Sequence, residues 1–110
     1  MNQEDVHIDP AKIREYLLSS SHPVGRFKAL FFFRLGYVAE EWEGLDRDLR
    51  SLLETGTRLP PIDGHHGLKH VVRGRIVGPN GMVADLTTVW ITRHGENTLR
   101  FVTAYPGEIG

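Results

Sequence analysis

The sequence of 110 residues contains no cysteine. This absence excludes disulfide bonds, iron–sulfur clusters, cysteine-ligated zinc and thiol nucleophiles. Long apolar runs are also missing, since no stretch approaches the roughly 20 apolar residues of a membrane-spanning helix. The acidic start, MNQEDVHIDP, lacks the basic and then apolar layout of a signal peptide. We therefore expect a cytoplasmic protein that makes no membrane contact.

The common motifs of enzyme active sites are missing as well. There is no glycine-rich phosphate loop, no nucleophile elbow and no HExxH pair. Acidic residues are few in the second half, where Asp85 and Glu96 are the two between residues 65 and 105. This scarcity argues against two-metal nuclease chemistry and glycoside hydrolysis, because both depend on clustered carboxylates.

What is present is the composition of one ordinary globular domain, with 40% hydrophobic and 25% charged residues. A chain of this length forms a single core. We expect one domain over residues 1–110, with a helical half at about 9–55 and a sheet half at about 57–106.

The net charge of −1 conceals an uneven distribution. Residues 22–36 include three basic residues and no acid, residues 37–56 include six acids and two arginines, and residues 65–105 include five basic residues and two acids. A basic face would attract a phosphate chain, and an acidic helix would suit a basic protein partner. The alternative is that these are ordinary solvated charges.

Three helices are predicted in the first half. An Asp–Pro pair begins a helix over residues 10–18, a second helix at residues 23–36 begins with proline and ends with glycine, and a third spans about residues 39–54. The second helix is apolar on most sides and the third has an apolar stripe with acids between. The side chains that we expect these helices to bury are Phe27, Phe31, Trp42, Leu45 and Leu49.

The periodicity then changes to two. Runs rich in β-branched residues predict strands at residues 69–77, 82–93 and 98–105, joined by the turns GPNG and HGEN, and residues 57–62 could add an edge strand. We predict the α+β class, with three N-terminal helices packed on one face of a three- to four-stranded antiparallel sheet. Alternation in the last strand predicts a partly buried side shared by Leu99, Phe101, Thr103 and Tyr105.

The segment SHPVGRFKA offers a first candidate site. His22 would stand at a helix N-terminus, with Arg26 and Lys28 just inside it. Free amides and the positive end of the helix dipole favour an anion there, and histidine exchanges a proton near neutral pH. Together these groups suit a phosphodiester. The alternative is structural: the histidine caps the helix and the two cations extend along its surface into solvent.

The predicted sheet supplies a second group, in which basic, hydroxyl and aromatic side chains alternate with apolar ones. Such a face could bind a phosphate backbone and stack a base. The alternative is ordinary strand chemistry, because Thr, Tyr and Trp are good strand formers. The residues that share a side within each strand are Lys69, Arg73 and Arg75, then Thr88 and Trp90, then Thr103 and Tyr105.

Three histidines, His65, His66 and His70, lie within six residues. They could be ligands of zinc or nickel, or they could belong to a polar loop before a strand. Because the cluster lacks an evident fourth ligand, we expect no metal here and no cofactor.

The blocks HPVGRFKA, FFFRLGY, GPNG, TVW and FVTAYP follow one another between residues 8 and 106. They resemble a family of small bacterial proteins and toxin tips described as a domain of unknown function, whose members often stand next to a second small protein, as in toxin–antitoxin pairs. The layout of helices followed by an antiparallel sheet is similar to that of the barnase, EndoU, colicin and RelE group of metal-independent endoribonucleases.

This resemblance implies RNA cleavage in which the 2′-hydroxyl attacks its own phosphate. His22 would exchange the proton, Arg26 and Lys28 would bind the phosphate, and Lys69 would be an additional phosphate contact. The implied partners are RNA and a small cognate antitoxin or immunity protein. Hydrogen bonds or base stacking would come from Thr88, Trp90, Thr103 and Tyr105.

Two other functions remain open at this point. The protein could be an interaction module of the antitoxin or immunity type, which presents its acidic third helix to a basic partner. It could also be a domain with a small-ligand pocket between helices and sheet. A nuclease is expected to be toxic when expressed without its partner, whereas a binding module is expected to be harmless.

Overall fold

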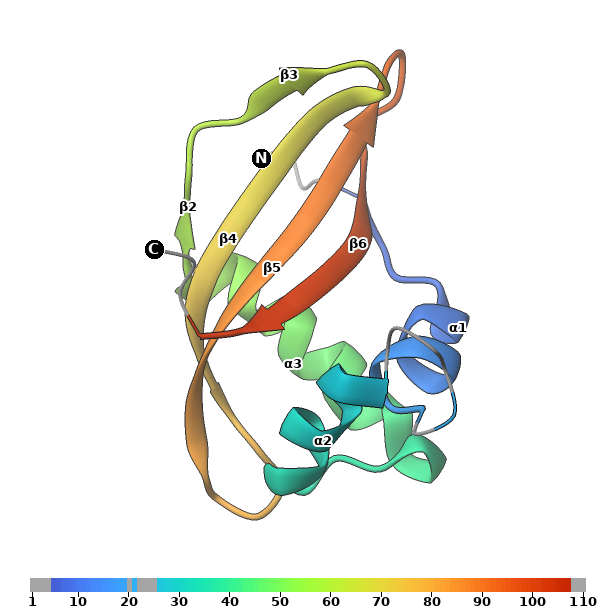
Figure 1. The fold of residues 1–110 in the computed structure, drawn as a ribbon. Coiled ribbons are helices and arrows are strands. Elements are labelled where there is room, and N and C mark those ends of the chain that lie inside the picture. Colours follow the sequence, from blue (N-terminus) through green and yellow to red (C-terminus); the bar gives the residue numbers. More distant parts are fainter. Residues whose placement is uncertain (1–4, 20, 22–25, 108–110) are drawn as a thin grey trace.

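The fold is a twisted sheet with helices behind it and at one end (Figure 1). The computed structural model describes residues 5–19, 21 and 26–107, without the side chains of residues 26 and 27. In chain order the elements are β1 (Asp5–His7), α1 (Pro10–Lys12), the π-helical η1 (Ile13–Leu17), α2 (Arg26–Arg34), the 3₁₀-helical η2 (Ala39–Glu41), α3 (Trp42–Thr55), β2 (Thr57–Arg58), β3 (Ile62–Gly64), β4 (Gly67–Val77), β5 (Val83–Arg93) and β6 (Thr98–Pro106).

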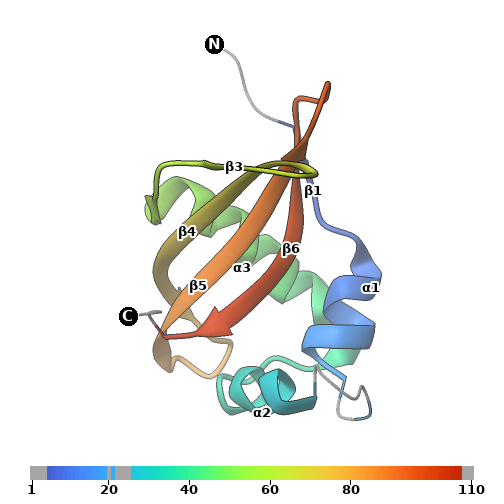
Figure 2. The same ribbon diagram turned by 45° about the horizontal axis from the view of Figure 1, so that its top comes forward.

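The α+β class is confirmed, but the predicted sheet of three to four strands is too small. The described residues form six strands in the order β1-β6-β5-β4-β2, with β3 also paired to β4. The helices are not strictly N-terminal, because β1 precedes them and pairs in parallel with β6, so the sheet is mixed. The prediction that all three helices pack on one face is also wrong: α3 lies behind the sheet, whereas α1 lies beside β6 and α2 at the end of the sheet (Figures 1 and 2). Strands of two or three residues are too short to show an alternating pattern, which explains why the sequence did not reveal β1.

The three long strands are confirmed, with ends within two residues of those predicted. The optional edge segment 57–62 corresponds to β2 and β3, which both pair with β4. The predicted first helix is present as α1 and η1, and the third as η2 and α3. The second is present as α2 in the part that the structure describes.

The core lies between α3 and one face of the sheet. Leu45 and Leu49 are fully buried, as predicted, and they face strand residues that include Val72 and Trp90. Phe31 and Trp42 are half-buried and pack against this core from its edge. The side chain of Phe27 lies outside the described residues, and Phe32 is the fully buried phenylalanine of α2.

Buried polar groups within the core satisfy one another. The Trp90 indole Nε1 donates to the Thr88 hydroxyl at 2.8 Å, and that hydroxyl donates to the Val72 carbonyl at 2.9 Å. This chain of hydrogen bonds offsets the cost of burying two polar side chains. It also orients the indole inward, against Phe101.

The tip of the β4–β5 hairpin holds the C-terminal end of α2. The Asn80 side-chain amide donates to the Arg34 carbonyl at 2.8 Å, and the Asn80 backbone N–H donates to the Leu35 carbonyl at 3.3 Å. These bonds satisfy helix carbonyls that would otherwise lack a partner. The approach is close enough that a Cβ atom added at Gly78 would lie 2.0 Å from the Leu35 carbonyl oxygen.

We expect Gly78→Ala to destabilise the protein by about 2–4 kcal/mol, because the methyl group would push the hairpin away from α2. Gly44→Ala is the matched control. A Cβ at Gly44, inside α3, would meet nothing closer than the Arg47 guanidinium at 3.7 Å, so this change should stabilise the helix by up to about 1 kcal/mol. Chemical denaturation of both variants measures the difference; equal stabilities would contradict the close hairpin–helix contact.

A cleft between the first helix, α2 and the last strand

A β-bulge in β6 determines which of its side chains reach the candidate site. Val89 pairs with Thr103, whereas the next residue, Trp90, pairs with Phe101, so Val102 is an extra residue in β6. A bulge of this kind reverses the alternation of the residues that follow it. Phe101 therefore points into the core, while Thr103 is on the opposite face.

The prediction that Leu99, Phe101, Thr103 and Tyr105 share one side is consequently wrong. Leu99 and Phe101 are buried before the bulge, and Ala104 is the buried residue after it. Thr103 and Tyr105 are only half-buried, on the face that α3 does not cover. Both side chains are thereby available to a ligand.

Lys28 of α2 meets these two residues of β6. Its ammonium Nζ donates to the Thr103 hydroxyl at 2.8 Å and to the Tyr16 hydroxyl at 2.7 Å. The same nitrogen lies 4.5 Å from the centre of the Tyr105 ring and 5.0 Å from the centre of the Tyr16 ring, within the range of cation–π attraction. Among the described residues, no carboxylate lies within ion-pair distance of Lys28.

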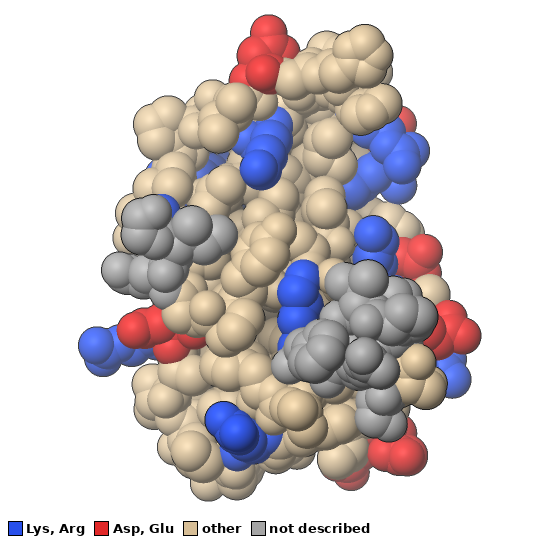
Figure 3. All heavy atoms as spheres, in the orientation of Figure 1, with Lys and Arg blue, Asp and Glu red and all other residues tan. Residues whose placement is uncertain are grey.

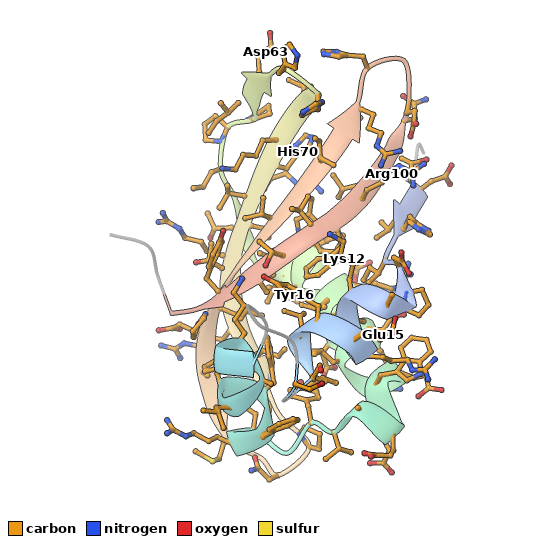
Figure 4. All side chains as sticks on the ribbon, turned by 45° about the vertical axis from the view of Figure 1, so that its right-hand side comes forward. Lys12, Glu15, Tyr16, Asp63, His70 and Arg100 are labelled. Carbon is orange, nitrogen blue, oxygen red and sulfur yellow. The ribbon has the colours of Figure 1, made fainter. Side chains whose placement is uncertain are left out.

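Tyr16 reaches this cluster from η1, and Figure 4 shows Tyr16 and Lys12 extending from the helical segment toward β6. Its hydroxyl lies 3.4 Å from the Thr103 hydroxyl. Burial raises the pKa of the Tyr16 phenol, but hydrogen bonds from Lys28 and Thr103 and the charges of Lys28 and Lys12 outweigh it and hold that pKa below the ordinary tyrosine value. These contacts thus favour the phenolate form of Tyr16.

These side chains line one cleft of about 640 Å³. Most of its lining residues come from α1, η1, α2 and β6, and Figure 2 shows α1 beside β6 and α2 at the end of the sheet. Its wall combines hydroxyl groups, aromatic rings and charges of both signs, with the two cations from different helical elements. The lining residues are Asp9, Ala11, Lys12, Glu15, Tyr16, Lys28, Val102, Thr103 and Tyr105.

Three of the sequence-predicted site residues therefore come together here: Lys28, Thr103 and Tyr105. His22 and the Arg26 side chain lie outside the described residues, although α2 begins at Arg26. Tyr16 was not predicted as a site residue. Its spacing from Ile13 and Leu17 places it on an apolar helix face, and no local pattern shows that its hydroxyl leaves that face to meet residues far along the chain.

The other predicted substrate-binding residues are separate from this cluster. Lys69 is exposed on β4, on the face not covered by α3. Thr88 and Trp90 are fully buried on the opposite, core-facing side. Because they are held there by the hydrogen bonds described above, we leave them out of the site: a base could reach them only if the core opened.

The histidine segment does not form a cluster. His65 and His66 are exposed, with their rings 5.2 Å apart. His70 is buried on β4, where its Nε2 lies 3.0 Å from the Thr92 hydroxyl. Within the described part of the chain, no group of three or more His, Asp or Glu side chains is placed to hold a metal ion.

The model of a family described as a domain of unknown function, DUF6883, matches residues 1–108. The chain belongs to this family. That the chain belongs to a family of unknown function is thus confirmed, whereas the signature blocks and the relation to the barnase, EndoU, colicin and RelE group stay predictions. Among the residues that the structure describes, no helix of this DUF6883 chain is both long and apolar enough to cross a membrane.

A solved structure of similar fold is one component of a contact-dependent growth inhibition toxin–immunity protein complex from Klebsiella pneumoniae 342. The TM-score is 0.73 and the match covers 92% of each chain, at 17% sequence identity. At this identity the likeness shows a shared fold. A search of curated proteins found no match.

We expect Lys28→Met to raise the pKa of Tyr16, because it removes a hydrogen bond and a charge that favour the phenolate while burial remains. Lys12→Met removes only a more distant charge and should raise that pKa less. The phenolate absorbance of each variant, titrated against the same variant with Tyr16→Phe, isolates this one phenol. An unchanged titration in Lys28→Met would contradict the contact.

Proposed function

We propose that this protein is a toxin-like, metal-independent endoribonuclease whose active site is the cleft around Lys28. The observation that supports this best is the half-buried Lys28 ammonium, which is surrounded by two hydroxyl groups and two aromatic rings and is not paired with a carboxylate in the described part of the chain. A cation in such surroundings attracts an anion, and hydroxyl donors beside it suit phosphate oxygens.

RNA cleavage suits these side chains because the nucleophile belongs to the substrate. The ribose 2′-hydroxyl loses its proton and attacks the adjacent phosphorus, a 2′-O–P bond forms, and the P–O5′ bond breaks as the 5′-oxygen takes up a proton. The products are a 2′,3′-cyclic phosphate and a 5′-hydroxyl. The protein has to move two protons and stabilise the extra negative charge of the phosphorane, and neither task requires a metal ion.

Each residue of the cleft has a role in this proposal. The Lys28 ammonium stabilises the negative charge on the non-bridging oxygens, and the Thr103 hydroxyl donates a hydrogen bond to one of them. The Tyr16 phenol, with its lowered pKa, exchanges one of the protons. Tyr105 offers a ring on which a base can stack. In the proposal His22 exchanges the second proton and Arg26 binds a phosphate.

The test is cleavage of total RNA and purified tRNA, with and without EDTA. We expect cleavage that EDTA does not abolish, slowed by roughly 10²–10³-fold in Lys28→Met. Arg34→Met is the matched control, because it removes the same charge from an exposed position on the same helix, and it should leave the rate nearly unchanged. Absence of any cleavage by the wild-type protein would refute the enzyme proposal.

Two further variants separate proton transfer from folding. Tyr16→Phe and His22→Ala should each slow cleavage by roughly 10²–10⁴-fold, the usual contribution of a positioned acid or base. His22→Ala should cost only about 1 kcal/mol of stability, the value of a helix cap. Thermal melting, measured together with the cleavage rate, distinguishes a catalytic from a structural role. A large loss of stability with an unchanged rate would assign these residues a structural role.

An immunity-type interaction module is the second candidate, because the structural neighbour belongs to a toxin–immunity complex. Its expected surface is the acidic helix α3. There Asp46 already pairs with Arg50 at 2.7 Å, and Asp48 accepts a hydrogen bond from the buried Tyr37 hydroxyl. The Arg50 pair offsets the charge of Asp46, whereas Asp48 keeps its charge but is held by Tyr37. Expression discriminates the two, since toxicity that Lys28→Met relieves supports the nuclease.

A further inference from the structure

We infer that the substrate of this cleft is an extended single strand of RNA that crosses the open face of the sheet from β6, over β5, to Lys69 on β4. The inference rests on the proposed function and specifies its substrate. It concerns the face that α3 leaves uncovered, which is turned toward the viewer in Figures 1 and 3.

The strand register connects the cleft to Lys69. Thr103 pairs with Val89, and Val89 pairs with Val71, so these three residues form one row across β6, β5 and β4. Lys69 is two residues from Val71 and on the same side of β4. With a strand spacing of about 4.8 Å and a rise of about 3.3 Å per residue, Lys69 lies about 12 Å from Thr103. A few nucleotides span this distance.

The neighbouring row is closed to a ligand. It runs from Tyr105 through Thr87 to Arg73. The Thr87 side chain is fully buried, its hydroxyl donates to the Gly107 carbonyl at 2.8 Å, and the Gly107 N–H donates to the Asp85 carbonyl at 2.7 Å. Gly107 therefore covers Thr87 in this row, and a strand leaving the cleft passes instead along the row of Val89 and Val71.

The surface along the open row is uncharged, and a cation stands at its end. Its middle consists of Val89, which is 7% exposed, and of the half-buried Val71 and Ile91, and Ile91 is the residue paired with Lys69. Lys69 is exposed and has no ion pair within the described residues. Figure 3 shows Lys and Arg side chains both within this face and at its edges, whereas the acidic side chains lie toward its edges.

Two other cations of this face, Arg75 and Arg100, already pair with carboxylates. Arg75 lies 3.5 Å from the Asp85 carboxylate, and Arg100 lies 3.1 Å from the Glu96 carboxylate. These pairs use the two acids of the 65–105 region. Lys69 is therefore the basic side chain on the open row that can take a phosphate without giving up a carboxylate partner.

The cleft itself selects a single strand. Lys28 is half-buried between the Tyr16 and Tyr105 rings, so a phosphate must enter between them. The bases of a duplex are stacked on one another and offer no free face to Tyr105. An unpaired strand exposes its base faces and bends to bring one phosphate inward.

Binding can be measured apart from cleavage with 2′-O-methyl RNA, in which the attacking hydroxyl is blocked. We expect the full chain to bind a single strand of about ten nucleotides several-fold more tightly than a dinucleotide or the matching duplex. Lys69→Ala should weaken binding of the ten-nucleotide strand several-fold and reduce its salt slope by about 0.7. It should leave dinucleotide binding unchanged.

Arg47→Ala is the control, since it removes one charge from an exposed residue of α3 on the covered side of the sheet. Lys69→Glu should show a larger loss than Lys69→Ala. Equal effects of the Lys69 and Arg47 variants, or equal binding of duplex and single strand, would overturn the inference. If wild-type protein cleaves RNA and Lys69→Ala leaves KM unchanged for long substrates, the inference fails while the proposed function stands.

Discussion

The bulge at Val102 is the constraint on which the candidate site depends. The first half of β6 must bury Leu99 and Phe101 against Trp90, while its second half must present Thr103 and Tyr105 to Lys28. A regular strand cannot do both with residues of the same parity, because alternate side chains share a face. One extra residue separates the two tasks, and the same strand then belongs to the core at one end and to the cleft at the other.

The cleft holds the half-buried Lys28 ammonium with no carboxylate of the described residues at ion-pair distance. Hydroxyl oxygens and ring faces stabilise the Lys28 ammonium less than an ion pair would. Part of the free-energy cost of its desolvation is therefore compensated only when an anion binds. Holding Lys28 there requires a fixed helix. The contact of Asn80 and Gly78 with the end of α2 supplies that support from the hairpin tip, at the opposite end of the helix from the site.

Periodicity and turn residues are enough to predict β4, β5, β6 and the helices, because long elements repeat their signal many times. They also place Lys28, Thr103 and Tyr105 among the candidate residues. Three features cannot be predicted from periodicity and turn residues. β1 is too short to show a period, a bulge at Val102 leaves no mark in an ordinary β-branched run, and the meeting of Tyr16 with Thr103 is a tertiary contact between residues 87 positions apart. Thr88 and Trp90 illustrate the same limit, since alternation groups them correctly but does not say which side is the core.

The parallel pairing of β1 with β6 and the bonds from Lys28 to Thr103, 75 positions later, have a consequence for the biosynthesis of the chain. The ribosome makes Tyr16 and Lys28 early, but their partners emerge only when β6 has been synthesised. Contacts this distant in sequence form late and slowly in folding. A nascent or truncated chain that ends before β6 thus has Lys28 but not the cleft that Thr103 and Tyr105 complete. On the proposed function, the cell that makes the protein is not exposed to its activity until translation has passed β6.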